Sequence, residues 1–233
     1  MTMINKNVLN PAEDLLHKVK GVYSTILADP PWQFQNRTGK MAPEHKRLLR
    51  YPTMSLGEIK SMPVRIVADD PSHLYLWCPN ALLQEGLEVM KAWGFQYKSN
   101  IVWHKIRKDG GSDGRGVGFY FRNVTEMILF GIKGRMRTLD PGRSQVNFLA
   151  TQKREHSRKP DEIFDIIESC SPGPYLELFA RFPRIGWSQW GNEDVEENRS
   201  NGVALRKGHV DSELRLGEPP RNYRGATKSM AKS

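Results

Sequence analysis

The sequence predicts an α/β fold in which a β-sheet is covered by helices on both faces. Runs of β-branched and aromatic residues alternate along the chain with segments whose apolar residues recur at helical spacing. The chain has 233 residues, of which 38% are hydrophobic, so it can form one domain with a substantial core. Ligands of such sheets collect at the carboxyl ends of the strands, so residues that directly follow a strand are the first candidates for a site.

Residue composition and a capping pattern predict the first strands and the first helix. Residues 22–28 (VYSTILA) have the composition of a buried strand. Residues 55–58 (SLGE) form a capping-box pattern that predicts the start of a short helix. Residues 73–77 (HLYLW) predict a second strand. These three segments open the alternation of strands and helices.

The middle of the chain continues this pattern. Residues 80–93 predict a helix that ends before Gly94. The apolar positions expected to face the core of that helix are Leu83, Leu87 and Met90. Residues 97–103 predict a strand, and residues 124–132 are apolar and β-rich. We interpret 124–132 as a strand, with an early helical turn as the alternative.

The last elements complete the predicted sheet. Residues 146–150 predict a short strand, and residues 175–179 (YLELF) a buried one. Residues 160–170 predict a helix, because a proline in its first turn is followed by acidic residues near its positive end. The inward positions of this helix are Ile163, Ile166 and Ile167. The sequence therefore predicts residues 22–193 as the folded part.

Charge is uneven along the chain, which carries a net charge of +9 at pH 7. Three loop-like stretches are basic, with five basic residues against one acid in 36–50, five against two in 104–122, and eight against two in 133–159. If the three frame one site, they form a groove for phosphates, so a nucleic acid is the expected partner. Solubility alone is the alternative reason for the charge. Residues 1–21 are expected to be an N-terminal extension, and 194–233 a flexible tail.

Several classes of protein are disfavoured by composition. Cys78 and Cys170 give neither a disulfide framework nor metal-ligand spacing, and the six histidines show no paired spacing. We therefore expect no metal site. The chain shows no signal segment at its start and no apolar run long enough to span a membrane, so we expect a cytoplasmic protein without a membrane partner.

The stretch 29–32 (DPPW) follows the first predicted strand and carries the strongest chemical signal. Asp29 is a hydrogen-bond acceptor, Pro30 and Pro31 stiffen the backbone so that nearby carbonyls point in a fixed direction, and Trp32 offers a flat face. Rigid acceptors beside an aromatic ring suit the exocyclic amino group of a nucleobase, whose poorly nucleophilic nitrogen they would activate electrostatically. The alternative is a simple turn with a satisfied aspartate and a packed tryptophan.

An ordered set of motifs gives this stretch a family context. From about residue 24 to 193 the chain reads ADPPWQF, YPTMSLGEI, LYLWCPN, AWGF, IVWHK, REHSRKPDEIFDIIE, PYLELFAR and GWSQWGNE. This order resembles the MT-A type family, which comprises catalytic subunits of eukaryotic mRNA adenosine methyltransferases and their bacterial and phage relatives. The resemblance implies a Rossmann-like class I methyltransferase fold with permuted (β-class) motif order. The short chain resembles the bacterial or phage branch.

The resemblance also implies residue roles, with S-adenosyl-L-methionine as cofactor. Asp29 and the Pro30 carbonyl would hold the target amino group, Pro31 and Trp32 would complete the catalytic motif, and Trp32 would line the base pocket. Lys159 would pair with the methionine carboxylate, and Asp29 would also lie near the methionine ammonium. The other residues implied to bind the cofactor are Tyr51, Glu177, Leu178, Phe179, Arg181, Asn192 and Glu193.

The chain departs from the family pattern at two places. Arg181-Phe-Pro-Arg184 replaces the Arg-Pro-His-Asn of the eukaryotic enzymes, so the histidine contact to the methionine carboxylate is missing and Arg184 is the candidate substitute. The acidic contact to the cofactor adenine precedes the DPPW strand in the family, and Asp14 is a weak candidate for it here.

The predicted activity is transfer of a methyl group to N6 of adenine in DNA. The same reaction on RNA is the alternative, and a catalytically silent nucleic-acid-binding partner subunit is disfavoured because Asp29 and Lys159 are both present. A homo- or heterodimer is an expected assembly. A target base in a duplex would have to be flipped out. The basic loops at 33–50, 104–122 and 133–158 would hold the nucleic acid through Arg37, Lys40, Lys46, Arg47, Lys105, Arg107, Lys133, Arg135 and Arg154.

Overall fold

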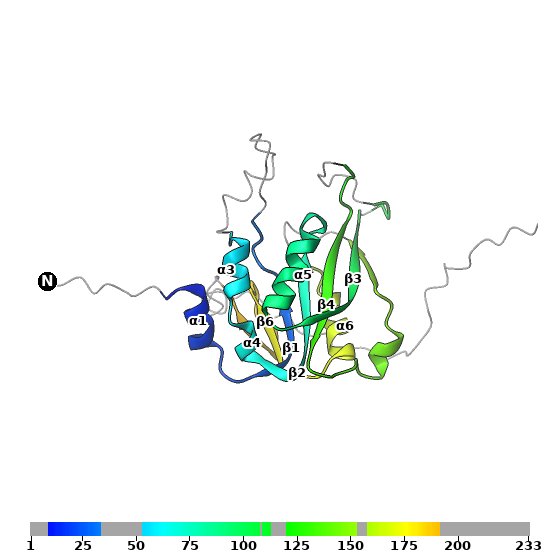
Figure 1. Ribbon diagram of the computed structural model, residues 1–233. Helices are drawn as coiled ribbons and strands as arrows, with labels where there is room; N and C mark the ends of the chain where they lie inside the picture. The colour runs from blue at the N-terminus through cyan, green and yellow to red at the C-terminus, as the bar shows by residue number, and fades with distance from the viewer. Residues whose placement is uncertain (1–8, 34–52, 108, 113–119, 153–157, 192–233) are drawn as a thin grey trace, which may run out of the picture.

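The computed structural model describes residues 9–33, 53–107, 109–112, 120–152 and 158–191 (Figure 1). Within them, seven strands form one sheet in the order β5-β3-β4-β2-β1-β6-β7. Their bounds are Tyr23–Ala28 (β1), Ala68–Cys78 (β2), Gln96–Ile106 (β3), Thr125–Lys133 (β4), Phe148–Gln152 (β5), Tyr175–Leu178 (β6) and Trp187–Trp190 (β7). The α/β fold class predicted from the sequence is confirmed.

Strand direction decides which residues meet. β1 pairs in parallel with β2 and β6, β6 with β7, and β3 with β5, whereas β4 runs antiparallel to both β2 and β3. Six strands therefore end at one edge of the sheet, which we call the carboxyl edge, and β4 begins there. The DPPW motif follows β1, and β6, which carries the YLEL motif, comes late in the chain but lies directly beside β1.

The helices are Pro11–Lys18 (α1), Leu56–Ser61 (α3), Val64–Val67 (α4), Leu83–Ala92 (α5) and Glu162–Cys170 (α6) (Figure 1). The capping box predicted at Ser55 and Glu58 is present. Helix α1 was not predicted, although Asn10 and Glu13 form a second capping box with a proline between them. Short 3₁₀ turns cover Asn80–Leu82 and Pro141–Ser144.

Two apolar clusters lie on the two faces of the sheet. One contains Leu74 and Leu76 of β2 with residues from α1, α3 and α5. The other contains Tyr75 and Trp77 with Ile163, Phe164 and Ile167 of α6. Alternate residues of β2 thus supply both faces, as the pleat of a strand covered on both sides requires.

The buried face of α5 differs from the prediction. Leu83 and Leu87 are 40% and 37% exposed, while Gly86, Val89 and Met90 are buried. A Cβ at Gly86 would stand 2.6 Å from the Cys78 sulfur, so this glycine lets the helix approach β2 closely. The helix therefore turns its small residue, and not its two leucines, toward the sheet.

Several strand bounds also differ. β2 and β3 have 11 residues each and extend beyond the predicted 73–77 and 97–103, because the sheet pairs polar flanking residues as well as apolar ones. β5 begins two residues later than predicted, and β7 was missed because four residues between Gly186 and Gly191 carry little strand signal. The segment 124–132 is the strand β4, without the alternative helical turn.

Candidate active site

Asp29 directly follows β1 at the carboxyl edge, and its backbone N–H donates to the Leu178 carbonyl of the neighbouring β6 over 3.4 Å. Its side chain is only 25% exposed. A buried strand with a parallel neighbour on each side thus fixes where this carboxylate stands. This is the position from which residues of α/β sheets reach a ligand.

Lys159 is the partner of Asp29, with its ammonium 3.0 Å from Asp29 Oδ1. The lysine precedes α6, and its ammonium also lies 3.4 Å from Glu126 Oε2 at the start of β4 and 5.0 Å from the centre of the Trp77 ring. Lys105 of β3 contacts the same Glu126 carboxylate. Four side chains from four parts of the chain therefore alternate in charge along the carboxyl edge: Lys105, Glu126, Lys159 and Asp29.

This charge row perturbs the titration of its members. Burial alone would lower the pKa of Lys159, but the Asp29 and Glu126 carboxylates outweigh it and raise the pKa above its usual value. Burial alone would raise the pKa of Glu126, but Lys159 and Lys105 outweigh it and lower the pKa. Both groups are therefore charged at neutral pH. Glu126 was missed by sequence reasoning, although an acid inside the apolar segment TEMILF was a usable signal.

A pocket of about 500 Å³, part of it open to solvent, lies beside this row. Polar side chains line one part of it and apolar ones the rest, and the full set is Leu27, Asp29, Trp77, Arg158, Lys159, Ile163, Phe164, Glu177, Phe179, Arg181 and Phe182. Five of the predicted site residues are thus brought together: Asp29, Lys159, Glu177, Phe179 and Arg181. Leu178 is fully buried in the core and does not line the pocket.

Glu177 lies in β6, directly across from Gln189 in β7. The Gln189 amide donates to Glu177 Oε2 over 3.1 Å and to the Phe182 carbonyl over 2.6 Å. Arg158 places its guanidinium 5.9 Å from the centre of the Phe182 ring and 3.1 Å from Asp161 Oδ2. Gln189 and Arg158 were not predicted as site residues.

Trp32, which the family resemblance assigns to the base pocket, is a packed tryptophan, as the alternative interpretation of the DPPW stretch had it. It is 7% exposed and packs in the core, where its indole N–H donates to the Trp77 carbonyl over 3.0 Å. Trp77 lines the pocket together with Phe164, Phe179 and Phe182, whereas Trp32 does not line it. The Pro30 carbonyl accepts the Trp32 backbone N–H over 2.8 Å, and the Pro31 carbonyl accepts that of Met54 over 2.9 Å. The two prolines thus form a tight turn after Asp29.

Arg184 and Asp14 both have structural partners away from the pocket. Arg184 is 4% exposed, and its guanidinium lies 3.2 Å from Glu168 and 3.5 Å from Asp165 on α6. The expectation that it replaces the missing histidine is therefore wrong, because it faces α6 and does not line the pocket. The Asp14 carboxylate accepts the indole N–H of Trp190 over 2.8 Å and pairs with Lys18, so it anchors α1 to β7.

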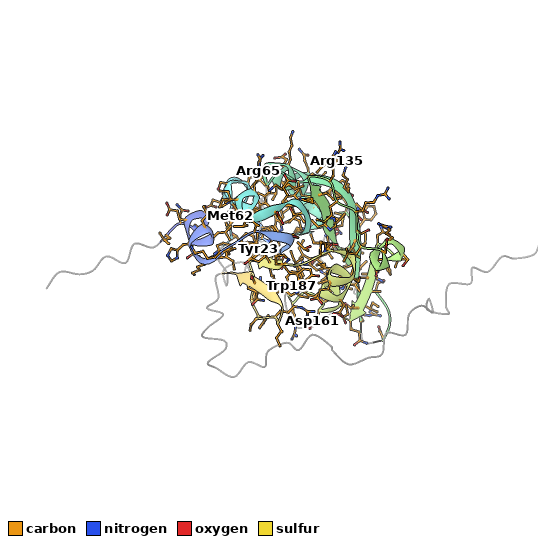
Figure 2. All side chains as sticks on the ribbon, turned by 90° about the horizontal axis from the view of Figure 1, so that it is seen from below. Tyr23, Met62, Arg65, Arg135, Asp161 and Trp187 are labelled. Atoms are coloured by element: carbon orange, nitrogen blue, oxygen red, sulfur yellow. The ribbon has the colours of Figure 1, made fainter. Side chains whose placement is uncertain are left out.

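The basic residues expected to hold nucleic acid divide between two edges. Lys105 and Arg107, at the end of β3, lie at the carboxyl edge. Lys133 ends β4 at the opposite edge, where its ammonium donates to the carbonyls of Ala68 (2.7 Å) and Arg65 (3.2 Å). Arg135 lies on that edge too, and Figure 2, seen from below, labels it. Because β4 is antiparallel to its neighbours, the basic stretch that follows it begins at the edge opposite Asp29. Lys133 and Arg135 therefore do not lie around the Asp29 site, and the expectation that all three basic stretches frame one groove is corrected.

Some predicted residues lie outside the part of the chain that the structure describes. These are Tyr51, Asn192, Glu193, Arg37, Lys40, Lys46, Arg47 and Arg154. The described residues on either side of 34–52 are held together at the carboxyl edge, where Trp32 and Met54 form a parallel bridge. Among the described residues, no group of three or more His, Cys, Asp or Glu side chains could hold a metal ion, and no helix is long and apolar enough to cross a membrane.

Comparisons with known proteins match this arrangement to one family. The MT-A70 family model matches residues 23–193. The type II methyltransferase M.MunI of a Mycoplasma species is 29% identical over 82% of this chain and 86% of its own length. The MT-A70-like probable N(6)-adenosine-methyltransferase of Oryza sativa is 30% identical over 94% of this chain, and the human N(6)-adenosine-methyltransferase catalytic subunit METTL3 is 27% identical over 75%.

The extent of these matches differs between relatives. The chain spans 29% of the length of the rice and human proteins, against 86% of M.MunI. The family match extends from the start of β1 to just beyond β7, so it contains the DPPW turn, the charge row and the pocket. The resemblance inferred from the ordered motifs is thereby confirmed, and the chain belongs to the MT-A70 family of methyltransferases.

Proposed function

We propose that this chain transfers a methyl group from S-adenosyl-L-methionine to the exocyclic N6 amino group of adenine in DNA. The observation that carries the proposal is the Asp29 carboxylate, which follows β1, is held by Lys159 at 3.0 Å, and faces a pocket lined by charged and aromatic residues. A carboxylate in a fixed orientation at this edge can accept a hydrogen bond from an amino group as that group reacts.

The pocket residues fit the proposed cofactor by their chemistry. The cofactor carries an ammonium, a carboxylate, ribose hydroxyls and a purine, and the pocket offers carboxylates from Asp29 and Glu177 and cations from Lys159 and Arg181. Asp29 would lie near the ammonium, Lys159 would pair with the carboxylate, and Glu177 would accept hydrogen bonds from the ribose hydroxyls. When bound, the cofactor supplies a methyl group on a positively charged, already electrophilic sulfur.

The chain's own residues would mainly align the amino group. Asp29 accepts a hydrogen bond from one N–H of the amino group. The Pro30 carbonyl already accepts a hydrogen bond from the Trp32 N–H, and its second lone pair is available for the other amino N–H. Two acceptors would localise the nitrogen lone pair that forms the new N–C bond, while the electrons of the broken S–C bond stay on the sulfur of the departing S-adenosylhomocysteine. The nitrogen is acidic once methylated, so its extra proton would pass to water and no strong base is needed. Lys159 keeps the Asp29 side chain from rotating away, and Trp77 and Phe179 give the pocket an apolar surface beside the carboxylate.

DNA is the substrate that the sequence predicts, and RNA is the alternative. Similarity supports both, because the chain is 29% identical to a type II methyltransferase and 27–30% identical to N(6)-adenosine-methyltransferases. The test is incubation with labelled S-adenosylmethionine and parallel DNA and RNA pools, followed by nucleoside analysis. Label in N6-methyldeoxyadenosine supports the proposal, and label confined to the RNA nucleoside would replace DNA by RNA as substrate.

Asp29 itself provides the decisive variant. We expect Asp29→Ala to abolish methyl transfer while nucleic-acid binding is largely retained. Asp140→Ala is the matched control, because Asp140 is exposed, precedes the 3₁₀ turn Pro141–Ser144, and does not line the pocket. Turnover by the Asp29→Ala protein would refute the mechanism. Cofactor binding without any turnover by the wild-type chain on either nucleic acid would favour the silent-subunit alternative.

Nucleic-acid binding by the carboxyl edge is tested by two exposed arginines. Arg107 lies at this edge and pairs with Asp109 over 2.8 Å, whereas Arg135 lies at the opposite edge. We expect Arg107→Ala to weaken binding and to reduce its salt dependence by about one phosphate contact, and Arg135→Ala to leave both unchanged. Binding that does not weaken with salt would exclude phosphate contacts. The cytoplasmic location and the homo- or heterodimer stay predictions.

A further inference from the structure

Gln189 connects two parts of the pocket wall through one side-chain amide. Its Nε2 donates to Glu177 Oε2 over 3.1 Å and to the Phe182 carbonyl over 2.6 Å. Both acceptors belong to residues that line the pocket, but Gln189 itself does not line it. The amide comes from β7, and pairing of β6 with β7 places Gln189 directly opposite Glu177. A single side chain behind the wall is thus bonded to a strand residue and to the loop that follows the strand.

The chemistry of an amide suits this place. A carboxylate in the middle of a sheet is costly unless donors surround it, and Gln189 supplies a donor without adding charge. A lysine or arginine at position 189 would neutralise Glu177 and weaken it as an acceptor of hydroxyl hydrogen bonds. The amide leaves the negative charge in place while it restricts the rotation of the carboxylate.

The second hydrogen bond of Gln189 holds the loop residue Phe182, which lines the pocket. Phe182 is held through its carbonyl, and its ring lies beneath the Arg158 guanidinium, whose carbon is 5.9 Å from the ring centre. Arg158 also lines the pocket. The positions of Phe182 and Arg158 therefore depend on the same amide that orients Glu177.

We propose that Gln189 is a positioning residue for cofactor binding, which holds the Glu177 carboxylate and the Phe182 backbone in the geometry that receives the ribose. The inference rests on the proposed function, because it assumes that the cofactor occupies this pocket. Its consequence is specific to one ligand: loss of the amide weakens cofactor binding and leaves nucleic-acid binding unchanged.

The experiment measures binding of S-adenosylhomocysteine by calorimetry, together with nucleic-acid binding, in folded full-length protein. We expect Gln189→Met, which keeps size without a donor, to weaken binding about tenfold at pH 7.5. Ser188→Ala is the control, because Ser188 is the exposed neighbour on the same strand, and it should bind as the wild type does. Equal affinity of Gln189→Met and wild type would overturn the proposal.

A second variant separates positioning from mere packing. Gln189→Glu places a second carboxylate beside Glu177, so binding should be weak at pH 8 and recover toward pH 5.5, as the pair takes up a proton that restores a hydrogen bond. A loss of affinity that does not vary with pH relative to wild type would also overturn the proposal, and this variant decides alone if Gln189→Met does not fold. A wild-type chain that fails to bind S-adenosylhomocysteine would instead refute the proposed function itself.

Discussion

Replacement of Glu126 by glutamine tests whether the charge row stabilises the fold. Glu126 Oε2 lies 3.4 Å from the Lys159 ammonium, and the carboxylate also contacts Lys105. At an effective dielectric constant of about 20, a pair at this distance is worth about 5 kcal/mol. Desolvation of the carboxylate, which is 27% exposed, offsets part of that energy. Because glutamine keeps one acceptor oxygen, we expect Glu126→Gln to lower the free energy of unfolding by about 1–3 kcal/mol at pH 7.5.

The pH dependence of this effect has a definite sign. The pKa of Glu126 is lower in the folded protein than its ordinary value, because Lys159 and Lys105 outweigh the effect of burial. A group with a lowered folded pKa contributes stability above its unfolded pKa, and that contribution is lost as pH falls through the folded pKa. The difference between wild type and Glu126→Gln should therefore be largest above about pH 5 and should shrink as the pH falls further.

Urea unfolding followed by circular dichroism at several pH values measures both effects. Glu88→Gln is the matched control, because Glu88 pairs with Lys60 at 3.1 Å but the two side chains are 42% and 38% exposed. Solvent screens an exposed pair of this kind, so Glu88→Gln should change the stability much less than Glu126→Gln does. The reasoning is refuted if Glu126→Gln is as stable as the wild type at pH 7.5, or if its deficit does not shrink in acid.

Three further substitutions test particular contacts. Trp32→Phe keeps an aromatic side chain but removes the donor to the Trp77 carbonyl and part of the buried ring, and urea unfolding should show a loss of about 1–3 kcal/mol. Burial lowers the pKa of His73 to about 4, so the wild type should lose stability as pH falls from about 6.5 to about 4, and His73→Gln should flatten this loss, which is at most about 3 kcal/mol. Arg184→Met removes a buried partner of Glu168 and should lower stability by about 2–4 kcal/mol without changing the affinity for S-adenosylhomocysteine; a tenfold loss of affinity in the folded variant would place Arg184 in cofactor binding after all.

The edge of the sheet that carries the pocket was predictable from local order along the chain. Asp29 follows a strongly apolar strand, and Lys159 precedes a helix with a clear N-terminal pattern. Parallel strands end at one edge, so a residue that follows β1 lies at the carboxyl edge. The meeting of Lys159 with Asp29 depends on the pairing of β1 with β6, and the sequence indicated it only through the family resemblance. The structure places the two charged atoms 3.0 Å apart.

Glu126, Lys133 and Gln189 could not be placed in the same way. The composition of β4 predicts a strand but not its direction, and its antiparallel direction brings Glu126 to the pocket edge and carries Lys133 to the opposite one. β7 has four residues, so its pairing with β6, which sets Gln189 beside Glu177, depends on the assembled sheet and not on a local pattern. Strand direction and partner are properties of tertiary packing.

The turn after Asp29 explains why Trp32 lies in the core while Trp77 lines the pocket. DPPW places a large ring two residues after the Asp29-Pro30 bond, but the sequence does not show which side of the turn is solvent. The tight turn carries Trp32 back into the core, while Trp77 at the end of β2 lies beneath Lys159. Trp77 therefore adds an aromatic surface to the pocket that the sequence did not predict.

The junction between β6 and β7 shows how the pocket wall is held in an unfavourable backbone conformation. Phe179 has φ of 62°, a region that non-glycine residues rarely adopt and that costs about 1–3 kcal/mol. Its ring packs edge-on against Trp190, and the Ala180 N–H donates to the Trp190 carbonyl over 2.9 Å. A Cβ at Gly191 would stand 2.0 Å from the Ala180 carbonyl oxygen, so only glycine lets the end of β7 lie this close. The two segments constrain each other, and this constraint keeps Phe179 turned toward the pocket despite its strained backbone.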